Sequence, residues 1–63
     1  MKKIPELDRL LELMSKEKES KGEVSRNTIK KYQDKYHKIF PRNPDGQTSV
    51  TIGYYTREYL RRL

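Results

Sequence analysis

Basic and polar side chains gather in the middle of the chain and again shortly after it. The first group begins the segment 25–39 and continues along one side of it: Ser25, Arg26, Asn27, Thr28, Lys30, Lys31 and Lys35. The second group is Arg42, Asn43 and Gln47. Lysine and arginine bind phosphate oxygens, whereas amide and hydroxyl side chains can hydrogen-bond to base edges. These residue types therefore predict binding to double-stranded DNA, and we take both groups as candidate DNA-binding residues.

The composition supports a polyanionic partner and excludes several other classes of protein. The 63 residues include 15 Lys and Arg against 9 Asp and Glu, which gives a formal net charge of +6. There is no cysteine, which excludes a disulfide scaffold, a cysteine zinc site and a thiol nucleophile. The single histidine, His37, has no partner residues in the sequence pattern that would make it a metal ligand or a general base. We expect no enzyme activity, no catalytic residue, no metal, no cofactor and no small-molecule ligand.

The chain carries no sign of a membrane segment. No apolar run approaches the roughly 18 residues needed to span a bilayer. The residues after Met1 are Lys2, Lys3 and, soon after, Pro5 and Glu6, which does not resemble a secretory signal. We therefore expect a cytoplasmic, nucleoid-associated protein with no membrane partner.

Two amphipathic helices are predicted in the first two thirds of the chain. In residues 4–17, apolar residues recur at helical spacing, and the polar, glycine-containing residues 18–23 are expected to form a loop. Ser25 is a good N-cap for a second helix over 25–39, whose apolar side carries Tyr32 and Tyr36. The lysines of the first group lie on the opposite side of this helix, which makes it the predicted recognition helix.

A small β-hairpin is predicted after the recognition helix. The turn sequence Asn-Pro-Asp-Gly at 43–46 precedes alternating apolar residues in 48–54, so residues 40–54 are expected to form a wing. Thr56 is then expected to begin a last helix over 56–63. Tyr54 is expected in the core and Tyr59 at the surface. The fold class that results is mostly α with a two-stranded hairpin, a single winged helix-turn-helix domain over residues 1–63.

Three stretches of the chain resemble one family of DNA-binding proteins. Residues 24–32, VSRNTIKKY, resemble the run that opens the recognition helix of MerR-type regulators. Pro41, Arg42 and Gly46 stand where that family has its wing, and residues 55–63, YTREYLRRL, are similar to the segment after the wing. Excisionases and some partition proteins are similar to the same winged-helix group. The resemblance implies sequence-specific duplex DNA binding, with the recognition helix in the major groove and the wing on the backbone.

Two functions of different class follow from these patterns. The first is DNA binding, as a small transcriptional regulator or as an excisionase- or partition-type architectural factor. A domain this small makes few contacts, so we expect a homodimer or multimer on DNA, with Leu13 as a candidate contact between subunits. The alternative is a protein–protein interaction module that docks through the leucine-rich first helix.

Overall fold

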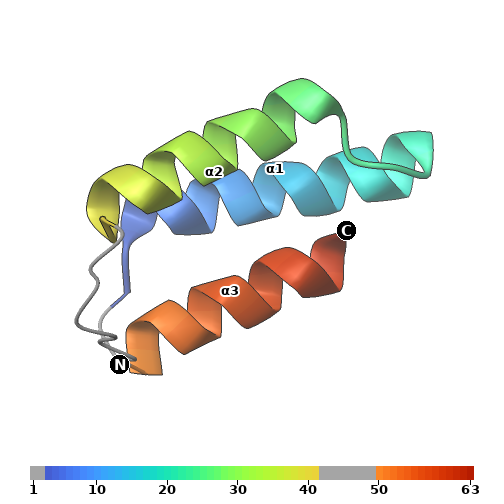
Figure 1. Ribbon diagram of the computed structural model, residues 1–63. Helices are drawn as coiled ribbons and strands as arrows, with labels where there is room; N and C mark the ends of the chain where they lie inside the picture. The colour runs from blue at the N-terminus through green and yellow to red at the C-terminus, as the bar shows by residue number, and fades with distance from the viewer. Residues whose placement is uncertain (1–2, 42–49) are drawn as a thin grey trace.

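Three helices make up the part of the chain that the structure, a computed structural model, describes, namely residues 3–41 and 50–63. They are α1 (Pro5–Lys21), α2 (Arg26–Ile39) and α3 (Val50–Arg62). Figure 1 shows α1 and α2 side by side and antiparallel, with α3 running along α1 in the same direction. Both α2 and α3 pack against α1, so α1 is the central element. Within these residues no helix is long and apolar enough to cross a membrane.

The first helix is longer than its apolar pattern predicts. Pro5 begins α1, where a proline costs no hydrogen bond, and Glu6 and Asp8 lie in the first turn, near the positive end of the helix dipole. The polar stretch predicted as a loop over 18–23 stays helical as far as Lys21. Its residues are mostly good helix formers, and no breaker occurs before Gly22. Gly22 ends the helix in the left-handed conformation, with φ of 81°, and its N–H donates to Lys18 O at 3.0 Å.

A hydrogen-bonded clasp joins the end of α1 to the start of α2. The carboxylate of Glu17 accepts from the backbone N–H of Ser25 at 2.8 Å and from the hydroxyl of Thr28. The hydrogen bond from Thr28, followed by those from Ser25, lowers the pKa of Glu17 to about 2. Ser25 is itself the N-cap of α2, and its Oγ accepts from the Thr28 N–H at 3.4 Å. The clasp therefore fixes the direction in which α2 returns along α1.

The hydrophobic core has one buried face from each helix. Leu7, Leu11 and Met14 of α1 pack with Tyr32 of α2 and Tyr55 of α3, and each of the five is at most 3% exposed. The Tyr32 hydroxyl donates to the backbone oxygen of Tyr55 at 2.9 Å, so the α2 and α3 tyrosines are tied together inside the core. In the described residues every buried side-chain nitrogen or oxygen has a hydrogen-bond partner. This matters because unpaired buried polar groups cost free energy.

The predicted β-hairpin wing is wrong. The described residues contain no strand, and residues 50–54, assigned to the second strand, form the beginning of α3. Phe40, assigned to the first strand, is the C-cap of α2 and its N–H donates to Tyr36 O at 2.7 Å. An isolated two-stranded hairpin is marginally stable. A helix from Val50 instead buries Tyr55 against α1, and this burial outweighs the β propensity of the alternating apolar residues.

The winged helix-turn-helix fold class is therefore corrected to a three-helix fold. In a helix-turn-helix the two helices cross at a steep angle, whereas α1 and α2 form an antiparallel hairpin (Figure 1). The last helix begins at Val50 and not at Thr56. The tip of the predicted wing, including Arg42, Asn43 and Gln47, lies outside the described residues.

Two glycine substitutions with opposite expected effects test this helix assignment. Gly53 lies inside α3, and a Cβ built there meets no atom within 4 Å. Gly53→Ala should therefore stabilise the domain by about 0.5–1 kcal/mol, because glycine is less favourable than alanine in a helix. Gly22→Ala should destabilise it by about 1–2 kcal/mol, because alanine is strained in the left-handed region. Melting temperatures from circular dichroism measure both, and an unchanged or lower value for Gly53→Ala would contradict the helix.

Candidate nucleic-acid interface

The two sides of α2 differ in polarity. On one side Thr28 and Tyr32 are buried against α1. On the other side the exposed residues include four of the predicted DNA-binding residues, Arg26, Asn27, Lys30 and Lys31, together with Lys38, which was not among them. Together these five residues form the basic face of α2. Lys35, also a predicted DNA-binding residue, is half-buried at the edge of this face.

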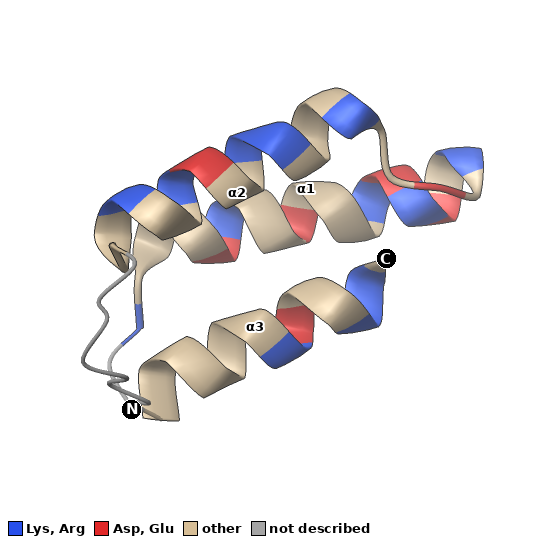
Figure 2. Ribbon diagram, viewed as in Figure 1, with Lys and Arg blue, Asp and Glu red and all other residues tan. Residues whose placement is uncertain are grey.

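The cations of the basic face carry no compensating partner in the described part of the chain. The ion pairs found there are within α1, between Glu12 and Lys16, and within α3, where Glu58 pairs with Arg61 and Arg62. None involves a residue of α2. Figure 2 shows the Lys and Arg positions recurring along α2, with one acidic position, Asp34, between them. The basic face is therefore free to bind an external anion.

Charge is distributed unevenly among the three helices. Helix α2 has five basic residues and one acidic residue, whereas α1 has four basic and five acidic residues. In α3, Arg57 and Arg61 are exposed. Arg62 is only partly exposed, donates to Ser15 Oγ at 2.6 Å and pairs with Glu58 at 2.7 Å. This pairing lowers the pKa of the Glu58 carboxyl. The positive net charge thus resides on α2 and α3.

Two of the predicted DNA-binding residues serve the fold in this structure. The Ser25 and Thr28 side chains form the clasp with Glu17, and Thr28 is 4% exposed. They face α1 and lie apart from the basic face. The structure brings together Arg26, Asn27, Lys30 and Lys31.

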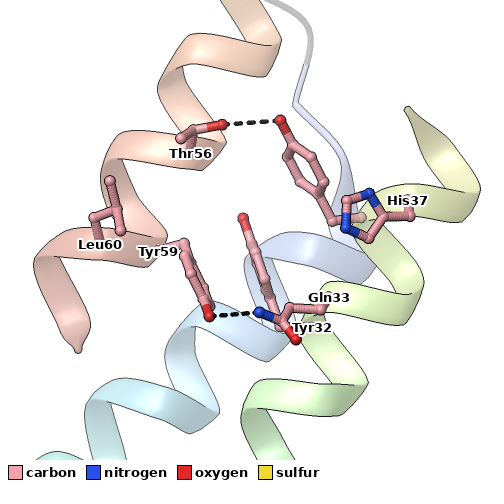
Figure 3. Close-up of a pocket in the computed structure, with 7 residues that line it drawn as sticks. Tyr32, Gln33, His37, Thr56, Tyr59 and Leu60 are labelled. Atoms are coloured by element: carbon pink, nitrogen blue, oxygen red, sulfur yellow. Dashed lines mark hydrogen bonds between the residues drawn. The ribbon is translucent and has the colours of Figure 1, made fainter. Parts of the chain in front are cut away.

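A pocket lies between α2 and α3, beside the basic face. Its volume is about 190 Å³. Tyr32, Gln33, Tyr36 and His37 line it from α2 (Figure 3). Thr56, Tyr59 and Leu60 line it from α3. It forms because α2 and α3 each pack against α1 and meet one another only through long side chains.

Aromatic rings and two hydrogen bonds build this pocket. The rings of Tyr32 and Tyr59 stack with centroids 4.9 Å apart, at an angle of 10°. Gln33 Nε2 donates to Tyr59 Oη at 3.1 Å, and the hydroxyls of Tyr36 and Thr56 are 2.8 Å apart (Figure 3). Both bonds connect α2 to α3 in exposed positions. Tyr32 is 2% exposed, so its ring forms the inner wall of the pocket, and this burial raises the pKa of its hydroxyl.

The pocket was not predicted from the sequence. Its α3 residues lie within the helix expected over 56–63, but no local pattern shows that this helix packs beside α2. Tyr59 was expected at the surface and is half-buried against Tyr32. A helix from Val50 places Thr56, Tyr59 and Leu60 on neighbouring positions one turn apart. The sequence signal for this wall was the i, i+3, i+4 spacing of Thr56, Tyr59 and Leu60, which places their side chains on one side of a helix.

No candidate metal site occurs in the described ranges, 3–41 and 50–63. No group of three or more His, Asp or Glu residues there could hold a metal ion. His37 is exposed and its ring contacts the edge of Tyr36. Comparisons of the chain with protein-family models, curated proteins and solved structures found no match.

Proposed function

We propose that this three-helix domain binds double-stranded DNA through the basic face of α2. The observation that carries the proposal is a row of exposed cations with no ion pair in the described residues, on a helix whose opposite side is buried. Arg26, Lys30, Lys31 and Lys38 would contact phosphates and release counterions from the duplex. A single exposed helix has the dimensions to lie along or within the major groove.

Asn27 is the residue proposed to read sequence. It is exposed in the first turn of α2, next to Arg26. An asparagine amide can form a bidentate pair with adenine in the major groove, and residues near the start of a recognition helix reach base edges. Lys35 would assist at the edge of the face. The resemblance of residues 24–32 to MerR-type recognition helices stays a prediction, as does assembly into a dimer on DNA.

The leucine-rich first helix offers little surface for the alternative function, docking to another protein. Leu7 and Leu11 are at most 3% exposed because they form the core with α2 and α3. Leu10 is half-buried. Leu13 is 39% exposed and is the one leucine of α1 with a substantial exposed area. Docking through α1 would therefore rest on the apolar surface of Leu13 and the half-buried Leu10, which line a shallow hollow on that helix.

A gain-of-function substitution tests the proposal without relying on damaged protein. Asp34 is the one acid of α2, is exposed, and repels phosphates near the lysines. Asp34→Lys should tighten binding to a short duplex by about tenfold and steepen its salt dependence by about one unit, since each phosphate contact contributes about −0.9. Glu12→Lys makes the same change of charge on α1, and its exposed pair with Lys16 contributes little stability.

Fluorescence anisotropy with labelled duplex, over a salt series, measures both variants. The proposal predicts tighter binding for Asp34→Lys and a much smaller effect for Glu12→Lys. Equal gains for the two variants would show that affinity follows net charge alone, and the basic face would then have no special role.

A further inference from the structure

We propose that the pocket between α2 and α3 binds one unpaired base of a nucleic acid whose phosphates contact the basic face. This inference rests on the proposed function and adds to it a preference for strands with unstacked bases. Three properties of the pocket carry it: its aromatic walls, its polar groups and the charge around it.

The walls of the pocket suit a flat aromatic ligand. Tyr36 and Tyr59 are half-buried, so part of each ring is open to a ligand. Leu60, which is 61% exposed, provides an apolar surface on the α3 side. A base that enters would bury this exposed apolar area and stack against tyrosine, which is how proteins bind single strands with little sequence preference. The space of about 190 Å³ suits one ring system and not a large ligand.

The polar groups at the pocket can hydrogen-bond to the edge of a base. Gln33 offers both a donor and an acceptor, Thr56 offers a hydroxyl, and His37 is exposed at the rim. In the structure Gln33 and Thr56 bond to tyrosine hydroxyls across the pocket. These bonds are exposed, so exchanging them for bonds to a base costs little.

The charge around the pocket favours a nucleotide over an uncharged aromatic compound or an apolar peptide side chain. Lys30 lies about one helical turn before Gln33, on the side of α2 that borders the pocket. Arg57 follows Thr56 on α3 and is exposed. Acidic residues are scarce on both helices, with Asp34 on α2 and the paired Glu58 on α3. A base in the pocket would thus have its flanking phosphates near cations on both sides.

Three labelled oligonucleotide probes test this inference. They are a blunt duplex, the same duplex with a single-stranded dT overhang, and single-stranded oligo-dT. At constant salt, the unmodified protein should bind the overhang duplex about five- to a hundredfold more tightly than the blunt one, the range expected for one stacked base. Since the chain has five tyrosines and no tryptophan, a stacked base should also quench its tyrosine fluorescence.

Leu60→Ser is the variant that removes the apolar wall, and Leu13→Ser is its matched control on α1. Both leucines are exposed, so neither change should disturb the core. Leu60→Ser should abolish most of the overhang preference while leaving affinity for blunt duplex nearly unchanged. Leu13→Ser should alter neither. Gln33→Ala, also at an exposed position, should weaken the preference in the same direction as Leu60→Ser.

The outcomes separate this inference from the proposed function. Salt-dependent binding of blunt duplex with no preference for the overhang or for oligo-dT would overturn the base pocket and leave the basic face intact. A preference that survives Leu60→Ser would also overturn it, because the unpaired base would then bind elsewhere. Absence of binding to all three oligonucleotides would overturn both, and an apolar protein side chain would become the better occupant.

Discussion

Replacing Tyr55 with alanine is expected to unfold most of this domain at room temperature. Removing a large buried aromatic ring costs about 3–5 kcal/mol. A core in a domain of this size rarely supplies more than about 3–5 kcal/mol in total. The Tyr55 side chain is 0% exposed and is the one residue of α3 buried in the core. Its loss should therefore detach α3 from α1 and reduce the helical circular dichroism signal at neutral pH.

The hydroxyl of Tyr55 adds a second contribution, which Tyr55→Phe isolates. The Tyr55 Oη accepts from the Ile4 N–H at 2.8 Å and donates to Asp8 Oδ1 at 2.7 Å. It thereby joins α3 to the start of α1, and burial raises its pKa. Phenylalanine keeps the ring and leaves the N–H and the carboxylate without this partner. We expect a loss of about 1–3 kcal/mol, or roughly 4–8 °C in Tm for each kcal/mol.

Tyr54 provides the matched control, because it is adjacent in the sequence and only half-buried. Tyr54→Phe should change the melting temperature much less than Tyr55→Phe. If the two substitutions lowered Tm equally, or if Tyr55→Ala melted like the unmodified protein, the packing of α3 on α1 described above would be wrong.

Reversing two charges on α2 is expected to have the largest effect on DNA binding. Lys30→Glu together with Lys31→Glu replaces two attractions to phosphate by two repulsions. At about 1 kcal/mol for each exposed charge pair, the change is about 4 kcal/mol, which is about a thousandfold in affinity. Both lysines are exposed and have no ion pair in the described residues, so the fold should stay intact, as circular dichroism can verify.

The control for this variant carries the same change of net charge on another helix. Arg9 and Lys16 are exposed on α1, and Arg9→Glu with Lys16→Glu should weaken binding less than tenfold. Anisotropy titrations of the same labelled duplex at one salt concentration compare the two proteins. A comparable loss in both would mean that DNA responds to total charge and not to the basic face.

The sequence was most informative about α2, where the N-cap and the apolar period agree. Ser25 has the hydroxyl that an N-cap needs, and the inward residues of 25–39 recur at helical spacing, so α2 and its outward lysines could be anticipated. The end of α1 could not, because its polar residues carry no apolar period and only Gly22 marks the stop. The partnership of Glu17 with Ser25 and Thr28 depends on how α2 returns along α1, which no local pattern encodes.

The beginning of the last helix, residues 50–54, was assigned to a strand because two periods coexist there, whereas a helix over 56–63 was expected. Val50, Ile52 and Tyr54 alternate as in a strand, while Ile52, Tyr55 and Tyr59 recur as on a helix. Burial decides between them, since the helix places Tyr55 in the core and leaves Val50 76% exposed. The pocket between α2 and α3 depends on how both helices pack against α1, which the spacing of Thr56, Tyr59 and Leu60 alone does not give.

The salt dependence of duplex binding by the unmodified protein tests the central proposal most directly. Anisotropy titrations over a range of salt concentrations give the slope of log affinity against log salt. With four cations of the basic face on phosphates, the slope should be about −3 to −4. In a Lys30→Ala, Lys31→Ala double variant it should be less steep by about two units. A slope near zero, or one that the double variant leaves unchanged, would contradict DNA binding by this face of α2.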